Sequence, residues 1–174
     1  SGYSRLLAAM GRAAGVEIFW IGGKSRGRDG SLEGNNHSWN AARIKGRWYL
    51  MDPTWSSPRS LGKKRKRKYK TEYLFTPPEM FVLGHCPKKP EWQLLRQPLT
   101  RGELLRQPWL KARFFVRGYT LTEPLPPQAT LGRGEQMKIK LQNPDGHHLR
   151  ATLAPMEQGE RGQCEAVQGR TVQV

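Results

Sequence analysis

The chain has 174 residues, of which 36% are hydrophobic and 25% charged, and its formal net charge is +16. This composition is typical of a folded globular chain and excludes one that is disordered throughout. No apolar stretch approaches the roughly 18 residues of a transmembrane helix, so the sequence predicts no membrane span. The two cysteines, Cys86 and Cys164, lie far apart and outside any metal-ligand spacing. We therefore expect no disulfide framework, no metal and no cofactor, and the scarcity of cysteine favours a cytoplasmic location.

The positive charge is concentrated in residues 1–115, which hold 23 Lys and Arg against 8 Asp and Glu, whereas residues 116–174 hold 7 against 6. All six tryptophans also lie in the first part. This break predicts a first domain over 1–115, a partial β-rich domain over 116–155 and a polar, disordered tail over 156–174. The second part has fewer than 60 residues. It is therefore too short for a complete immunoglobulin-type sandwich of about 100 residues, and we expect only a part of one.

The first predicted element is an amphipathic helix over residues 2–14. Apolar side chains recur there at helical spacing, and Gly15 follows as a C-terminal stop. The apolar run 16–21 predicts a short buried strand. Glycines and polar residues then predict a loop over 22–36.

A β-hairpin is predicted over residues 37–55, because two apolar, aromatic runs flank Lys45 and Gly46. Lys is a poorer first turn residue than Asn or Asp, so a four-residue loop stays open as an alternative. A two-residue turn would place Ile44 opposite Arg47.

The register of this hairpin brings two chemically interesting residues together. Counting outward from the turn, Trp39 faces Asp52, and His37 shares the face of Trp39. His37 is then diagonal to Asp52, at about 7–8 Å between backbones. We therefore expect the imidazole and the carboxylate to be hydrogen-bonded or nearly so. Without further information, a His satisfied by an acid within a half-buried sheet is the more common situation.

Beyond the hairpin, residues 56–70 predict a polar loop and residues 72–76 a further strand. Pro77 and Pro78 start a short helix, and residues 85–115 are expected to wrap around the core.

The remaining part of the chain predicts three β-strands, over residues 120–127, 136–142 and 147–153. The last two are joined by a turn at 143–146, whose sequence is Asn-Pro-Asp-Gly.

A run of six basic residues lies within the polar loop 56–70. It is a candidate contact for a polyanion such as nucleic acid, an anionic lipid surface or an import receptor. A solvated insertion loop is the favoured alternative, because no recognition helix or aromatic groove accompanies the run. We expect residues 59–69 to be exposed and poorly ordered, since like charges cannot be buried unpaired. The run consists of Lys63, Lys64, Arg65, Lys66, Arg67 and Lys68.

Several segments resemble the transglutaminase-like superfamily. Residues 36–55, which begin Asn-His-Ser-Trp-Asn-Ala and end Gly-Arg-Trp-Tyr-Leu-Met-Asp-Pro-Thr-Trp, resemble its His–Asp box. Residues 11–17 resemble the end of its nucleophile helix. Residues 71–81 and 90–95 resemble its kyphoscoliosis peptidase-like branch, which also has cytokinesis-linked members. The similarity covers about residues 1–118, and its pieces occur in the family's order.

The resemblance implies an α+β, papain-like core, in which a nucleophile helix packs on an antiparallel sheet. In the family that helix opens Cys-Ser-Gly-Tyr, and this chain opens at the Ser of that motif. The nucleophilic Cys is therefore expected immediately before Ser1, and the chain as it stands is expected to be inactive. His37 would accept the thiol proton and return it to the leaving amine, and Asp52 would orient His37. Neither Cys86 nor Cys164 is expected to replace the nucleophile, since neither begins that helix.

Trp39, Asn40 and Trp55 are candidates for lining a substrate groove. For Asn40 a backbone-bonding role is the alternative. Core packing is the favoured prediction for Trp48 and Trp92.

Three function classes follow. The leading one is a cysteine peptidase or transglutaminase-like hydrolase or acyltransferase, which acts on a protein or peptide substrate through a Cys-His-Asp triad. Water and an amine both stay open as the acceptor. The second is a non-catalytic scaffold or protein-interaction domain with the same fold, linked to the cytoskeleton. The third is a polyanion binder that acts through residues 63–68.

Overall fold

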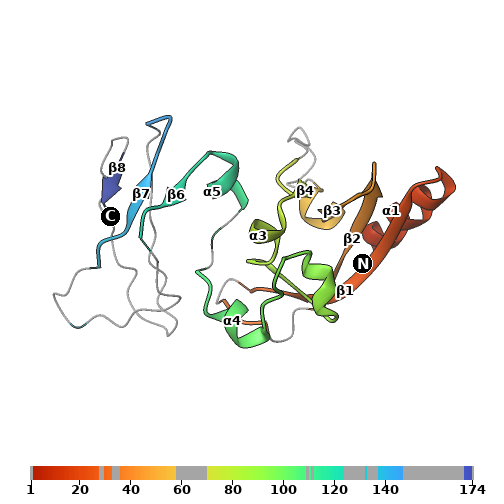
Figure 1. Ribbon diagram of the computed structural model, residues 1–174, viewed down its shortest axis with the longest axis horizontal. Helices are drawn as coiled ribbons and strands as arrows, with labels where there is room; N and C mark the ends of the chain where they lie inside the picture. The colour runs from red at the N-terminus through yellow and green to blue at the C-terminus, as the bar shows by residue number, and fades with distance from the viewer. Residues whose placement is uncertain are drawn as a thin grey trace, which may run out of the picture. The chain divides into compact units, whose positions relative to one another are not determined.

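The computed structural model describes residues 2–27, 30–32, 36–57, 70–108, 110, 112–123, 132, 137–146 and 171–173. They belong to two compact units, residues 1–105 and 106–174. The first unit contains a five-stranded antiparallel sheet with strand order β4-β3-β2-β1-β5 (Figure 1). The α+β character expected from the sequence is confirmed. The predicted boundaries after residues 115 and 155 stay a prediction.

The helices of the first unit are α1 (Gly2–Ala13), α2 (Pro53–Ser56), α3 (Pro78–Phe81) and α4 (Arg101–Leu105), with the 3-10 helix η1 (Pro90–Gln93). Its strands are β1 (Glu17–Ser25), β2 (Asn36–Ile44), β3 (Arg47–Met51), β4 (Leu74–Thr76) and β5 (His85–Pro87). The central strand is β2, and α1 lies alongside β1 and β2 (Figure 1).

The predicted N-terminal helix is confirmed as α1, but only part of its apolar stripe faces the core. Tyr3, Leu6 and Met10 are 57%, 58% and 60% exposed, whereas Ser4 and Ala8 are buried. The side of α1 that packs on the sheet carries the small residues Ser4 and Ala8 together with the partly buried Leu7.

Hydrogen bonds explain why small side chains of α1 face the sheet. The hydroxyl of Ser4 lies 2.8 Å from the hydroxyl of Ser38 in β2, and both side chains are buried. The amide of Asn40 donates to the backbone oxygen of Ser4 at 2.9 Å. Such buried polar pairs form only at close approach, so the first turn of α1 presents small side chains to β2. The first turn of α1 is consequently fixed to β2.

The predicted loop over 22–36 is partly wrong, because β1 continues to Ser25 and β2 begins at Asn36. A Cβ on Gly23 would lie 2.3 Å from the backbone oxygen of Cys86 and 2.5 Å from the ring of Trp39. Gly23 therefore serves a close approach between strands rather than a turn. The strand is also less buried than predicted, since Phe19 is 44% exposed.

The hairpin prediction is confirmed in its register. Ile44 pairs with Arg47, and the ladder runs outward to Asn40 and Met51. Lys45 has a φ of 48° and Gly46 a φ of 79°, the positive values that a two-residue type I′ turn requires. The alternative four-residue loop is not adopted.

The two faces of the sheet carry separate apolar clusters. On the α1 side, Leu7 and Val16 pack against the buried residues Ile18, Ala42 and Met51. The other face buries Ile21, Trp39, Ala41, Leu50 and Phe81. Trp48 and Trp92 are partly buried against this second cluster, as the sequence predicted.

Residues 70–105 match the sequence predictions unevenly. The short helix after Pro77 is confirmed as α3, while the strand predicted from residue 72 begins only at Leu74. Residues 85–87 were expected to wrap around the core but form the edge strand β5, which pairs with β1. The basic run 63–68 lies outside the described residues.

The second unit contains α5 (Ala112–Val116) and the strands β6 (Thr120–Leu121), β7 (Lys140–Gln142) and β8 (Thr171–Gln173). The strands form an antiparallel sheet in the order β6-β7-β8. The predicted turn is confirmed, since the amide of Gly146 donates to the oxygen of Asn143 at 3.1 Å. Strand β8 corrects the tail prediction for residues 171–173. The strand predicted over 147–153 lies outside the described residues, and the immunoglobulin-like character stays a prediction.

In the part of the chain that the structure describes, no helix combines the length and apolar character needed to cross a membrane.

Candidate functional site

His37 and Asp52 meet at one end of the β2–β3 hairpin. His37 lies near the start of β2, and Asp52 follows β3 directly. The His37 Nε2 donates to Asp52 Oδ2 at 2.5 Å, so the contact predicted from the hairpin register is confirmed. The side chain of Asp52 is fully buried and that of His37 is 10% exposed. Among the described residues, nothing hydrogen-bonds to the other ring nitrogen of His37, Nδ1.

Asp52 is fixed by the turn of helix that follows it. Its Oδ1 accepts hydrogen bonds from the backbone amides of Thr54 at 2.8 Å and Trp55 at 3.0 Å. An Asp at the N-cap with Pro53 at the first helical position is a strong local signal for a helix start. The four-residue sequence Asp-Pro-Thr-Trp therefore anchors one oxygen of the carboxylate, Oδ1.

The structure adds His85, a residue that sequence analysis missed. His85 begins β5 and is 1% exposed. Its Nε2 lies 2.9 Å from Asp52 Oδ2, the oxygen that also receives His37. Its Nδ1 lies 3.1 Å from the backbone oxygen of Phe81. No local pattern pairs residues 85–87 with β1, so the sequence offered no signal that would bring His85 to the site.

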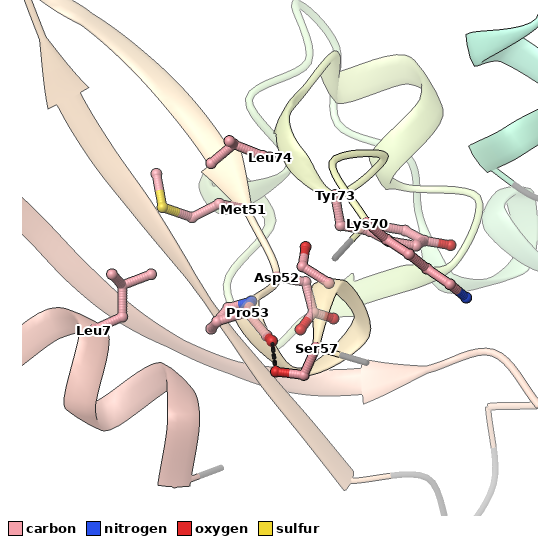
Figure 2. A pocket seen from close by; sticks show the side chains of 9 residues that line it. Leu7, Met51, Asp52, Pro53, Ser57, Lys70, Tyr73 and Leu74 are labelled. Carbon is pink, nitrogen blue, oxygen red and sulfur yellow. Dashed lines mark hydrogen bonds between the residues drawn. The ribbon is translucent and has the colours of Figure 1, made fainter. Parts of the chain in front are cut away.

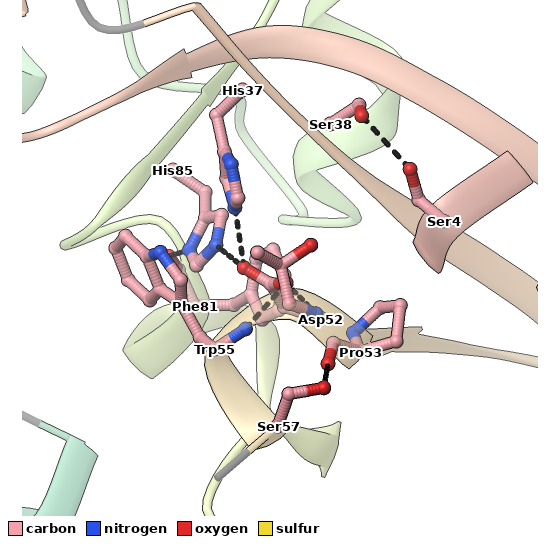
Figure 3. Close-up of polar contacts among 10 residues, drawn as sticks. Ser4, His37, Ser38, Asp52, Pro53, Trp55, Ser57, Phe81 and His85 are labelled. Carbon is pink, nitrogen blue, oxygen red and sulfur yellow. Dashed lines mark hydrogen bonds and ion pairs between the residues drawn. The ribbon is translucent and has the colours of Figure 1, made fainter. Parts of the chain in front are cut away.

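Aromatic rings enclose the two imidazoles. Phe81 stacks on His85 with ring centroids 3.9 Å apart, and Trp39 meets its edge at 4.9 Å. The ring of Trp55 lies 4.3 Å from that of His85 and stacks on His37 at 5.3 Å. Figure 3 shows both imidazoles directed at the Asp52 carboxylate, with Ser4 and Ser38 in contact nearby. The rings hold the imidazoles in place and keep water away from His85.

The buried carboxylate stays ionised because of its donors. Burial alone would raise the pKa of Asp52, but the hydrogen bonds from His37 and His85 outweigh it and hold that pKa below the usual range. Burial lowers the pKa of His85, although its hydrogen bond to Asp52 opposes this effect. The state of the site at neutral pH is therefore an Asp52 carboxylate that accepts from two imidazoles.

These shifts predict that acid destabilises the fold. The Asp52 pKa is lower in the folded than in the unfolded chain, so its contribution is complete above the unfolded value of about 3.9 and is lost as pH falls toward the folded value. The pKa of His85 is also lower in the folded than in the unfolded chain, so stability falls further as the pH drops below about 6.5. We expect the free energy of unfolding in urea to fall from pH 7 to pH 3, on the order of 1 kcal/mol of it through Asp52. The Asp52→Asn variant should lose the Asp52 part of this dependence, and an identical pH profile in that variant would contradict the prediction.

The same three side chains bear on metal binding. Their donor atoms lie within 4.8 Å of one another. However, the two nitrogen–oxygen separations are 2.5 and 2.9 Å. Two ligands of a tetrahedral zinc, each about 2.0–2.1 Å from the metal, lie about 3.3 Å apart. The separations in this site are those of hydrogen bonds, so the three side chains form a hydrogen-bonded network rather than a zinc ligand set.

A pocket of about 220 Å³ adjoins Asp52 on the α1 side of the sheet (Figure 2). Leu7, Met51, Tyr73 and Leu74 supply much of its apolar wall, and Lys70 contributes an amine. Neither His37 nor Trp55 lines it, so this pocket does not open onto the exposed ring of the base.

Comparison with known proteins identifies the family. Residues 1–53 match the family model described as the transglutaminase-like superfamily. The chain is 32% identical over 130 residues to kyphoscoliosis peptidase of Homo sapiens and to that of Mus musculus, alignments that cover 71% of this chain. The chain belongs to the transglutaminase-like superfamily. It is also 29% identical to Hillarin of Drosophila melanogaster over 94 residues, which cover 47% of this chain and 12% of Hillarin.

These relatives place the transglutaminase-like chain in the kyphoscoliosis peptidase-like branch, as its sequence predicted. The chain spans 20% of the length of the two kyphoscoliosis peptidases. The similarity therefore concerns this domain and not the whole of those proteins.

The predicted groove residues of this transglutaminase-like core lie in different environments. Trp39 and Asn40 are both fully buried. The amide of Asn40 donates to the backbone oxygens of Ser4 and Phe19, which is the backbone-bonding alternative. A groove-lining role for Trp39 and Asn40 is corrected, because neither presents surface to a substrate. Trp55 is half-buried beside His37 and stays a candidate.

Cys86 does not compete for the role of nucleophile in this transglutaminase-like core. It follows His85 in β5, and successive side chains of a strand point to opposite faces. Burial raises the pKa of its thiol, although Arg101 and Lys24 oppose the effect. Cys86 is therefore a thiol rather than a thiolate at neutral pH. Cys164 lies outside the described residues.

Proposed function

We propose that this chain is the core of a thiol acyl-transfer enzyme, with a Cys immediately ahead of Ser1 as nucleophile, His37 as general base and Asp52 as the orienting acid. The observation that carries the proposal is the hydrogen bond between His37 Nε2 and Asp52 Oδ2. Among the residues that the structure describes, His37 Nδ1 has no hydrogen-bond partner. The substrate class is a protein or peptide carbonyl, either a peptide bond or a glutamine carboxamide.

The hydrogen bond determines which nitrogen of His37 acts as base. The Asp52 carboxylate can only accept, so the imidazole carries its hydrogen on Nε2 and has its lone pair on Nδ1. In the reaction the thiol proton passes to Nδ1, and the thiolate sulfur attacks the substrate carbonyl carbon. The tetrahedral intermediate collapses to a thioester, and the leaving amine takes the proton from Nδ1. Water or an amine then attacks the thioester and releases the thiol.

The position of α1 supports a nucleophile at its start. Ser4, in the first turn of the helix, is hydrogen-bonded to Ser38, which follows His37 in β2. The start of α1 is thus attached to the same strand as the base. The partial positive charge of a helix N-terminus and a nearby imidazole both stabilise a thiolate.

Acylation by an activated ester tests the proposal. We expect p-nitrophenyl acetate to acetylate a chain that has been extended by one Cys ahead of Ser1, and intact mass followed by peptide mapping should place the acetyl group on the added Cys. His37→Ala in the extended chain should abolish most of this acetylation, because no base remains to take the thiol proton. The unextended chain is the matched control for reaction at other residues. Equal acetylation of the added Cys with and without His37 would refute the proposal.

A non-catalytic interaction domain with the same fold is the second candidate function. It is favoured by the solvent-exposed apolar residues of α1, namely Tyr3, Leu6 and Met10. Binding of polyanions through residues 63–68 stays a prediction, and a steep loss of affinity with added salt would be its signature.

A further inference from the structure

We propose that His85 is a positioning residue of this site, which donates from Nε2 to the Asp52 oxygen that receives His37 and so holds the carboxylate toward the base. The inference rests on the proposed function, because a carboxylate needs this alignment only if His37 acts as a base. It assigns a role to a buried polar side chain that the Cys-His-Asp mechanism does not itself require.

The first step of the argument is the set of partners around Asp52. Its Oδ1 is held by two backbone amides at the start of α2. Rotation about the Cβ–Cγ bond moves both oxygens together, so donors on either oxygen resist it. His85 at 2.9 Å and His37 at 2.5 Å both contact Oδ2. His85 therefore adds a buried donor on Oδ2, which further restricts rotation of the carboxylate and keeps Oδ2 in line with His37.

The second step is the location of the hydrogen on His85. An ionised carboxylate has no hydrogen to donate, so the contact with Asp52 requires one on His85 Nε2. Hydrogen bonds to a charged acceptor are about twice as strong as those between neutral groups. The carboxylate is thus the preferred partner over the oxygen of Phe81, which lies 3.1 Å from Nδ1. We expect a neutral His85 to carry its hydrogen on Nε2.

The third step is that the ring has no other arrangement open to it. His85 is 1% exposed, Phe81 covers one face of its imidazole, and Trp39 and Trp55 approach from other directions. The imidazole cannot turn toward solvent without opening the core. A buried donor of this kind orients its acceptor permanently, as partners of metal-bound and catalytic histidines do.

The competing explanation is that His85 only fills volume in the core. Two substitutions separate the explanations, because the amide nitrogen of Gln lies near the position of Nε2 and that of Asn near the position of Nδ1. His85→Gln keeps a donor for Asp52, and His85→Asn keeps one only toward Phe81. A filler role predicts that both variants leave His37 unaltered, whereas a positioning role predicts that only His85→Gln does.

Nuclear magnetic resonance of the imidazole nitrogens in the unextended chain measures the effect. In the parent chain and in His85→Gln, we expect His37 to carry its hydrogen on Nε2 alone, and His37→Ala identifies its signals. In His85→Asn we expect loss of this single form, with both ring nitrogens of His37 carrying hydrogen in part. An unaltered His37 in a folded His85→Asn variant, or equal disturbance in both variants, would overturn the inference.

A second measurement serves if His85→Asn does not fold. The inference requires a hydrogen on Nε2 of His85 in the unmodified chain, and an Nε2 without hydrogen at neutral pH would overturn it.

Reactivity of the added Cys separates this inference from the proposed function. If that thiol depends on His37 but responds equally to His85→Asn and His85→Gln, the inference alone fails. If the thiol does not depend on His37 in the parent chain, the proposed function fails and His85 has no base to position.

Discussion

A Cys added ahead of Ser1 should be alkylated by iodoacetamide at pH 6 roughly ten times faster than Cys86. An ordinary thiol with a pKa near 8.5 is almost entirely protonated at that pH, whereas a thiol at a helix N-terminus beside an imidazole titrates between about 3.5 and 7.5. The thiolate population rises by about two orders of magnitude, and the lower nucleophilicity of a less basic thiolate reduces the net gain. Burial raises the pKa of the Cys86 thiol, which makes it a suitable slow reference within the same chain.

His37→Ala in the extended chain should slow this alkylation at pH 6 and leave the rate above pH 9 nearly unchanged. The reason is that His37 affects the thiol pKa and not the intrinsic reaction. The unextended chain should show no thiol acyl transfer, since removal of a triad nucleophile costs on the order of 10⁶-fold in a serine protease. An added thiol that reacts no faster than Cys86, with no response to His37→Ala, would leave the domain with a binding role.

Asp52→Ala should destabilise the fold by about 3–5 kcal/mol, which urea unfolding at pH 7 would measure. The Asp52 side chain is fully buried and joins two imidazoles to the N-terminus of α2. Removal of one partner from a buried, hydrogen-bonded pair leaves the others without compensation. The loss of the N-cap accounts for about 1 kcal/mol of this destabilisation.

Asp52→Asn is the matched control, because it preserves shape and can still cap α2 through its amide oxygen. We expect a smaller loss of about 1–3 kcal/mol. Its NH₂ group would face the two imidazoles, so His37 would have to accept on Nε2 and carry its hydrogen on Nδ1. Reactivity of the added Cys should then fall as far as it does in His37→Ala. Equal unfolding free energies for the Ala and Asn variants would mean that the cap and the side-chain shape, which only Asn retains, contribute nothing to stability.

The sequence predicted those parts of the fold that depend on neighbouring residues. The Lys45-Gly46 turn determines the hairpin register, and the register in turn brings His37 to Asp52. Both steps use local rules of turn geometry and strand alternation. The contact between His37 and Asp52 could therefore be derived from the hairpin sequence alone.

The parts that were missed depend on contacts between distant segments. His85 reaches Asp52 because β5 pairs with β1 across about 60 residues of chain, and a three-residue strand has no periodicity to reveal it. Gly23 suggested a loop because glycine is common in loops, whereas its role is to let Trp39 and Cys86 approach the strand. The exposure of Tyr3, Leu6 and Met10 was also missed, because it depends on the contact of Ser4 with Ser38, 34 residues away.

The small buried side chains of α1 have a consequence for the evolution of such an enzyme. Ser4 and Ala8 are buried against the sheet, and Ser4 is bonded to the residue after His37. The small side chains let α1 approach β2 closely, and this close approach would determine the distance between the sulfur and the imidazole. A displacement of about 1 Å can cost about 100-fold in rate. Natural selection for catalysis would thus disfavour any side chain larger than that of Ala8 at this position, although Ala8 contributes no reactive atom.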